Sequence, residues 1–82
     1  MTADSAIRRH LGRYMTEVRQ DSGILQREIA AELGVTRYAV SCWENGRRAV
    51  PLEAFIRWCT FLHITPGDTL THVLAKTRRT TS

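Results

Sequence analysis

The chain has 82 residues, which is enough for one small domain and too few for two independent cores. Its apolar fraction of 43% favours a small packed globule, and no apolar run is long enough for a membrane span or a signal peptide. Twelve basic residues against eight acidic ones give a net charge of +4, which suits a polyanionic partner without requiring one. We therefore expect a soluble cytoplasmic protein.

The N-terminal part of the chain predicts one amphipathic helix. Apolar residues recur there at i, i+4, i+7 and i+11, on one stripe: Ile7, Leu11, Tyr14 and Val18. Asp4 or Ser5 can cap the start of this helix, and Gly23 can end it in a left-handed turn. Gly12 inside it is a weakness of about 1 kcal/mol relative to alanine.

Two short helices are predicted next. The first spans Gln26 to Leu33 and is closed by Gly34. Thr36 can cap the second, which runs to about Glu44 and ends at Gly46. The residues expected to face the core are Ile29, Ala30, Leu33, Val40 and Trp43.

A fourth helix and a short fifth helix complete the prediction. Pro51 fits the first position of the fourth helix, with Trp58 at the margin of this buried stripe: Leu52, Phe55, Ile56, Cys59 and Leu62. The run from Thr65 to Asp68 is typical of a helix cap, and the fifth helix uses Leu70, Val73 and Leu74. The domain is then expected at residues 1–75, followed by a flexible basic tail at 76–82. Since no segment alternates with period two, the predicted fold class is all-α.

The cysteines and histidines indicate no cofactor or metal site. Cys42 and Cys59 lie in apolar helical patterns, without a CxxC pair or a tight cluster with histidine, so reduced thiols are expected. His10, His63 and His72 have no spacing typical of metal ligands. No paired carboxylates, nucleophile with a base or phosphate loop is visible, so the sequence does not predict an enzyme or a small-molecule ligand.

The segment from Gln26 to Asn45 has the organisation of a helix-turn-helix, with two short helices joined by a glycine turn. The run DSGILQREIAAELGVTRYAVSCWENGRR, followed by PLEAFIRWCTFLHITPGDTL, resembles the Cro/C1-type (XRE-like) helix-turn-helix family of the lambda and 434 repressors. The resemblance covers roughly residues 7 to 75. It implies a five-helix lambda-repressor-like bundle and a DNA-binding transcriptional regulator.

The sequence departs from the family pattern at four positions. Leu25 stands where the family usually has a serine, threonine or asparagine cap, and His63 replaces a common glycine at the end of the fourth helix. Tyr38 and Cys42 are unusual where many relatives carry polar residues that contact bases.

The start of the third helix is the expected reading surface, because an α-helix fits the major groove with its first residues nearest the base edges. These residues are Thr36, Arg37, Tyr38, Ser41 and Cys42. Arg37 can pair with guanine O6 and N7, with a phosphate contact or a solvated side chain as the alternatives. Tyr38 can contact a thymine methyl group or a phosphate, or pack on the scaffold. Ser41 and Cys42 can contact a thymine methyl group or merely allow close approach.

The resemblance implies further roles around this helix. Gln26 matches the family glutamine that binds phosphate and braces the recognition helix, with a solvated side chain as the alternative. The loop expected on the DNA backbone contains Asn45, Gly46, Arg47 and Arg48. Glu44 is expected to form a structural ion pair with Arg19, so neither is counted as a DNA contact, and Trp43 and Trp58 are expected in the core.

The predicted function is that of a Cro-like or small phage or plasmid repressor, which occupies a palindromic operator in double-stranded DNA as a dimer. A weak homodimer, strengthened on DNA, is expected through apolar residues near the end of the domain: Phe61, Leu70, Val73 and Leu74. The alternative is that these residues only close the core of the monomer. The alternative is a protein-interaction adaptor or an antitoxin-type module with the same fold.

Overall fold

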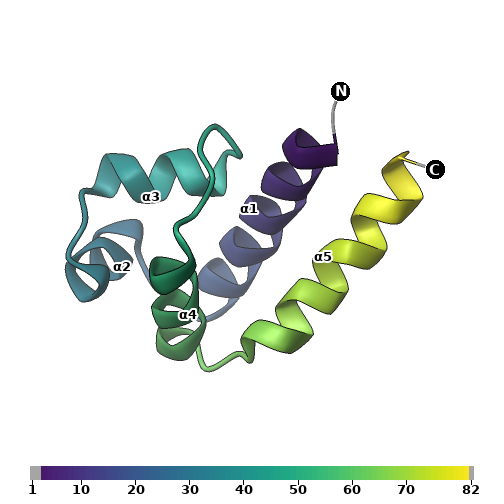
Figure 1. The fold of residues 1–82 in the computed structure, drawn as a ribbon. Coiled ribbons are helices and arrows are strands. Elements are labelled where there is room, and N and C mark those ends of the chain that lie inside the picture. Colours follow the sequence, from purple (N-terminus) through teal and green to yellow (C-terminus); the bar gives the residue numbers. More distant parts are fainter. Residues whose placement is uncertain (1–2, 82) are drawn as a thin grey trace.

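The computed structural model describes residues 3–81, with side chains for 5–79, and within that range it contains five helices and no strand. In chain order these are α1 (Ala3–Asp21), α2 (Gln26–Leu33), α3 (Arg37–Glu44), α4 (Leu52–Phe61) and α5 (Pro66–Thr81) (Figure 1). The all-α prediction is therefore confirmed, and α2 and α3 have the expected bounds. No helix in the described range is long and apolar enough to cross a membrane.

The two longest helices, α1 and α5, run side by side in opposite directions, so the two ends of the chain lie at the same end of the molecule (Figure 1). The other flank of α1 contacts α3, and α2 packs against both α3 and α4. The helix-turn-helix formed by α2 and α3 is thus held by α1 and α4, while α5 completes the bundle along α1.

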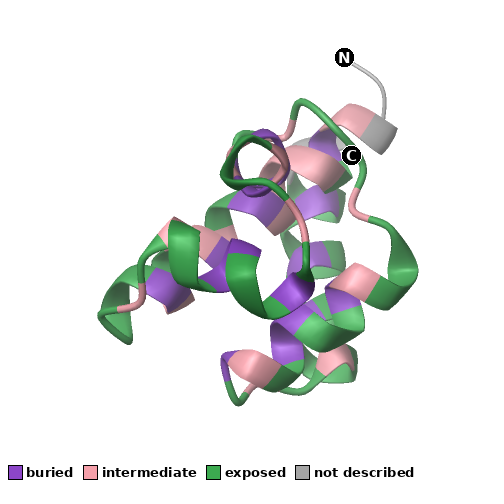
Figure 2. Ribbon diagram, turned by 90° about the vertical axis from the view of Figure 1, so that its left-hand side faces the viewer, coloured by how far each residue is buried: buried purple, intermediate pink, exposed green. Residues whose placement is uncertain are grey.

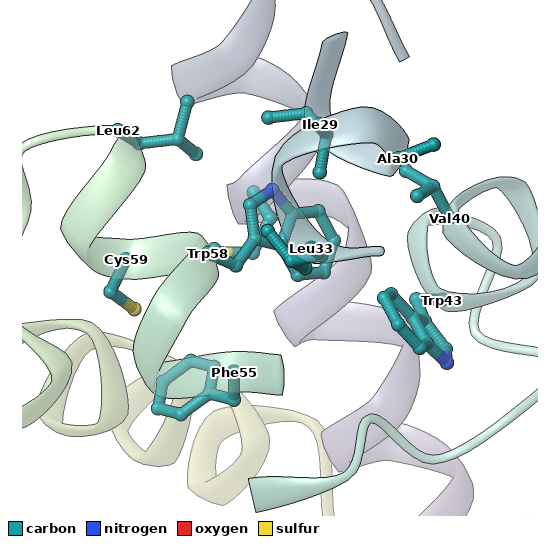
Figure 3. Packing of buried hydrophobic residues seen from close by; sticks show 10 residues of the cluster. Ile29, Ala30, Leu33, Val40, Trp43, Phe55, Trp58, Cys59 and Leu62 are labelled. Carbon is teal, nitrogen blue, oxygen red and sulfur yellow. The ribbon is translucent and has the colours of Figure 1, made fainter. Parts of the chain in front are cut away.

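The core lies where α1, α2, α3 and α4 meet. Its fully buried side chains include Met15, Ile29, Val40 and Trp58. The rings of Trp43 and Trp58 approach to 5.8 Å between centroids and are tilted by 43°, an arrangement worth about 0.5–1.5 kcal/mol beyond the buried area (Figure 3). Both tryptophans are core residues, as predicted. The buried residues lie on the sides of the helices that face one another (Figure 2).

Local interactions fix the helix ends around the turn. Gly34 has φ of +70°, the left-handed conformation that favours glycine, and Thr36 Oγ1 accepts a 3.0 Å hydrogen bond from the Ala39 amide at the start of α3. The side chain of Leu25 cannot cap α2, and the Glu28 carboxylate instead accepts a 3.0 Å hydrogen bond from the Leu25 amide. His63 adopts φ of +59° where the family commonly has glycine.

The predicted buried stripe of α4 was wrong at three positions. Leu52 is 71% exposed and Ile56 is 45% exposed, whereas Trp58, expected at the margin, is fully buried. The buried face follows the i, i+3, i+4, i+7 spacing of Phe55, Trp58, Cys59 and Leu62, as the largest side chain occupies the centre of the core. Pro51 precedes α4 as its N-cap and is not its first helical residue.

Two further expectations for the long helices need correction. Ile7 is 36% exposed, because α1 buries Ala6 and Met15 instead. The fifth helix, predicted to be short and to be followed by a tail at 76–82, runs from Pro66 to Thr81. Packing along α1 explains this extension, since Thr77 is buried and its hydroxyl donates to the Val73 carbonyl oxygen at 2.9 Å.

Gly12 has a specific role at the crossing of α1 and α3. A Cβ atom at this position would lie 2.5 Å from the carbonyl oxygen of Trp43, a distance that real Cβ atoms essentially never show. The same hypothetical atom would also clash with the carbonyl of Glu44. The missing side chain therefore permits the close approach of α1 to the last turn of α3, and this compensates for the low helix propensity of glycine.

Replacing Gly12 with alanine should lower the free energy of unfolding by about 1–3 kcal/mol, because the methyl group has to push the two helices apart. Gly67→Ala is the matched control, since no atom lies within 4 Å of a Cβ there, and a gain of about 0.4–1 kcal/mol is expected. Chemical denaturation followed by circular dichroism measures both. Equal stabilities of the two variants would show that the crossing is not tight.

Candidate DNA-binding surface

A buried ion pair joins α1 to the end of α3. Arg19 Nε donates to Glu44 Oε2 at 2.7 Å, and Arg19 Nη2 donates to Glu44 Oε1 at 3.1 Å. Both residues are buried, at 9% and 8% exposure. Arg19 Nη1 also donates to the Ile24 carbonyl oxygen at 2.8 Å, which fixes the turn between α1 and α2. The ion pair expected from the family resemblance is thus present, and it is bidentate.

Gln26 extends this pair to α2. Its Nε2 donates to Glu44 Oε1 at 2.8 Å, so the Glu44 carboxylate accepts hydrogen bonds from both α1 and α2. Gln26 is the first residue of α2 and is only partly buried. The network therefore holds the N-terminus of α2 at a fixed place beside α3.

The N-terminal half of α3 presents its polar side chains to solvent. Thr36, Arg37 and Tyr38 are exposed, with Tyr38 at 62%, and Ser41 is partly exposed. The opposite face of the same helix carries Val40 into the core. One side of α3 is thus committed to packing, and the other is free to contact a partner.

The loop after α3 lies against this exposed face. The guanidinium carbon of Arg48 stands 5.3 Å from the centre of the Tyr38 ring, a cation–π contact, and Asn45 Nδ2 donates to Ser41 Oγ at 3.3 Å. Asn45, Arg47 and Arg48 are all exposed. These contacts place the basic loop next to the side chains expected to read bases.

Cys42 does not belong to the exposed face, contrary to the prediction. It is 3% exposed, since the apolar arc of α3 extends around the helix from Val40 through Trp43 to position 42. Cys42 and Cys59 are both free and buried. Burial raises the pKa of the Cys59 thiol, partly offset by a hydrogen bond with Thr69.

One candidate residue was missed in the sequence. Arg27 is exposed in the first turn of α2 and lines a surface groove together with Gln26 and Arg37. Its position directly after the expected phosphate-binding glutamine is the signal that could have identified it. The groove joins the N-terminal ends of α2 and α3, where backbone N–H groups and helix dipoles favour an anion.

The predicted dimer residues divide into two groups. Val73 is 2% exposed and belongs to the monomer, because α5 turns it toward α1; its assignment as a dimer contact was wrong. Leu70 and Leu74 are each 45% exposed, and Phe61 is partly buried against the core.

The described part of the chain holds no cluster of three or more His, Cys, Asp or Glu residues that could bind a metal ion. The exposed groups gathered around α3 include hydrogen-bond donors and cations, the kinds of group that contact bases and phosphates in protein–DNA complexes.

Comparisons with known proteins agree with this fold and this surface. Residues 10–73 match the model of the helix-turn-helix domain family. The structure is similar to that of the clp gene regulator ClgR from Corynebacterium glutamicum, with 27% sequence identity and a TM-score of 0.82, over 90% of this chain and 79% of that one. Among curated proteins, none matches the chain.

A second similar structure is the restriction-modification controller protein C.AhdI from Aeromonas hydrophila. It shares 29% sequence identity and a TM-score of 0.71, over 83% of this chain and 98% of that one. Both similar proteins are named as regulators or controllers, not as enzymes. The chain belongs to the helix-turn-helix domain family, has the lambda-repressor-like fold and is a DNA-binding transcriptional regulator of the Cro/C1 type.

Replacing Glu44 with glutamine should lower the free energy of unfolding by about 3–5 kcal/mol, because the Arg19 guanidinium would stay buried without its counter-charge. Glu32→Gln is the control, as this exposed carboxylate in the last turn of α2 should change stability by less than about 0.5 kcal/mol. Denaturant titration of both variants tests the pair. A loss below 1 kcal/mol in Glu44→Gln would mean that solvent reaches the site.

Proposed function

We propose that the protein represses transcription by occupying a specific operator, with the N-terminal half of α3 in the major groove and two copies on two half-sites. The observation that carries this proposal is the two-sided character of α3. Its exposed side combines Arg37 and Tyr38 with the basic loop after the helix, while its other side is core. Such an arrangement is typical of a recognition helix.

Arg37 is the proposed base-reading residue. Its side chain is exposed at the first position of α3, the part of a recognition helix that lies closest to the base edges. A guanidinium group can donate two hydrogen bonds to O6 and N7 of one guanine, which a lysine cannot do. Thr36, Tyr38 and Ser41 then contact neighbouring bases or phosphates.

Gln26 and the loop after α3 are the proposed phosphate contacts. The Gln26 amide nitrogen carries two N–H groups, of which one donates to Glu44, so the second can donate to a phosphate. Asn45, Arg47 and Arg48 offer an amide and two cations on the same side of the molecule. Such contacts fix the register of α3 on the duplex but carry no base preference.

The proposed dimer contact uses the apolar side chains of Leu70 and Leu74 on α5, together with Phe61 at the end of α4. One recognition helix reads only a few base pairs, and a two-fold pair reads two half-sites about one helical turn apart. A small apolar patch gives a weak dimer in free solution, which binding to adjacent half-sites strengthens.

Selection of bound sites from random DNA defines the operator, and Arg37→Ala should then weaken binding to it by about 1–3 kcal/mol and relax the preference at one base position. Arg37→Lys keeps the charge and removes the two-pronged fork, so it should lose the same preference. Fluorescence anisotropy on operator and random DNA provides the data. A lysine variant with full specificity would reduce Arg37 to a phosphate contact.

Changing Arg47 and Arg48 together to alanine should weaken binding to all DNA sequences alike. The slope of log affinity against log salt should flatten by up to about two units, because two fewer counterions are released. Arg47→Lys with Arg48→Lys is the control and should retain the slope. An unchanged slope in the alanine variant would remove this loop from the interface.

Leu70→Gln with Leu74→Gln should leave the fold intact and abolish cooperative binding to an operator with two half-sites, since both residues are 45% exposed in the monomer and lie outside its core. Val73→Asp should instead unfold the protein, because it buries a charge. Circular dichroism and band-shift titration distinguish the two outcomes. Cooperative binding by the glutamine variant would place the dimer contact elsewhere.

The adaptor alternative makes a different prediction for the same measurements. A protein-interaction module with this fold would select no DNA sequence and would show no salt-dependent binding to a duplex. The exposed arginines at the start of α3 and in the following loop favour the regulator.

A further inference from the structure

Positive charge is concentrated at the end of the molecule that holds both chain ends. Three segments far apart in the sequence lie toward that end: the first two thirds of α1, the loop after α3 on one side of it and the C-terminal half of α5 on the other (Figure 1). They carry eight of the twelve basic residues: Arg8, Arg9, Arg13, Arg47, Arg48, Lys76, Arg78 and Arg79. Two acidic residues, Glu17 and Glu44, line grooves on this surface, and the Glu44 carboxylate is already paired with Arg19.

The basic part of α1 adjoins the loop after α3. A Cβ atom on Gly46 would lie 2.9 Å from the Cα atom of Arg9, so the loop backbone rests on α1 at this point. Arg9 and Arg13 line a surface groove together with Glu17 of α1, and its other wall includes Glu44 and Asn45. The two α1 arginines therefore lie beside a residue that we assign to the DNA backbone.

The basic part of α5 adjoins the same stretch of α1. A second groove is lined by His10, Arg13 and Glu17 of α1 and by His72 and Lys76 of α5. Arg13 and Glu17 line both grooves, so they form the ridge between them. The surface is thus continuous from the loop after α3, across α1, to α5.

The orientation of α5 separates this basic surface from the proposed dimer contact. The buried stripe of α5 contains Thr69, Val73 and Thr77. At 100° per residue, Lys76 and Arg79 fall on one flank of that stripe, whereas Leu70 and Leu74 fall on the other. A polyanion on the basic flank leaves the apolar flank accessible.

The charges on this surface lie close enough to act on one another. Desolvation and the positive charges of Arg9, Arg13, Lys76 and Arg79 lower the pKa of His10 below its ordinary value of 6.5. Four cations around one imidazole repel each other, and a bound polyanion relieves that repulsion.

We propose that a cationic face formed by Arg9, Arg13, Lys76 and Arg79 binds DNA phosphates beyond the base pairs that α3 reads. The inference rests on the proposed function and deepens it: the interface extends past the helix-turn-helix onto α1 and α5. Duplex DNA is the polyanion that fits, because Arg9 and Arg13 of the cationic face share a groove with Asn45, which we propose as a contact to the DNA backbone.

The test compares duplexes of two lengths with two protein variants. The short duplex contains a single half-site and no flanking base pairs. Two long duplexes contain the same half-site, one extended on its left side and the other on its right. Lys76→Ala with Arg79→Ala removes two charges at exposed helical positions, where alanine preserves the helix. Lys76→Arg with Arg79→Lys keeps both charges.

The wild-type protein should bind one extended duplex more tightly than the short one. The alanine variant should lose that gain, and its salt slope on the extended duplex should flatten by up to about two units, with affinity for the short duplex unchanged. The charge-retaining variant should behave as the wild type.

Two results would overturn the inference while leaving the proposed function intact. One is an alanine variant that keeps both the higher affinity for the extended duplex and the wild-type slope of log affinity against log salt. The other is an equal loss on short and extended duplexes, which would indicate a general effect of net charge. A wild-type protein that binds neither duplex would contradict the proposed function itself, and the cationic face with it.

Discussion

The buried carboxylate of Glu44 is the constraint on which the arrangement of the first three helices depends. Moving a carboxylate and a guanidinium out of water costs several kcal/mol for each ion, and the pair is tolerated only with good geometry and satisfied hydrogen bonds. Here Arg19 supplies two donors and Gln26 a third. Since Arg19 belongs to α1 and Glu44 to α3, a shift of either helix leaves a buried charge without its partner, and a shift of α2 removes one hydrogen bond from the carboxylate.

The close packing at Gly12 and the ion pair act together. α3 has only eight residues and would be marginal as an isolated helix, so its position comes from tertiary contacts. Its C-terminal half is anchored by the tryptophan core, the backbone contact at Gly12 and the Glu44 network. This leaves the N-terminal half exposed but rigidly placed, as recognition of base edges requires.

The sequence predicted best what local chemistry determines. Gly34 favours a left-handed turn that ends a helix, and Thr36 favours a helix N-cap. The bounds of α2 and α3 could therefore be predicted from these two residues. In α4, apolar residues lie on more than one face of the helix, so periodicity alone does not identify the buried face. The buried face is the one that carries Trp58, the largest side chain of the core. Cys42 was misplaced because it was grouped with its neighbour Ser41 in the expected reading surface, whereas the buried arc of α3 includes position 42. The convergence of Arg13 with Lys76 depends on how α5 packs along α1, which no local pattern encodes.

The central claim is that the Arg19–Glu44 pair serves to orient the DNA-binding groups and not merely to stabilise the fold. The most direct measurement replaces both partners with apolar residues, Arg19→Met with Glu44→Leu, and determines unfolding free energy and operator affinity on the same protein. Such a replacement removes the buried charges together and is often neutral for stability. Gln26, however, loses the carboxylate that holds it. We expect the double variant to keep a free energy of unfolding near that of the wild type and to bind the operator at least about tenfold more weakly, or 1.4 kcal/mol. A double variant with both wild-type stability and wild-type operator affinity would contradict the claim.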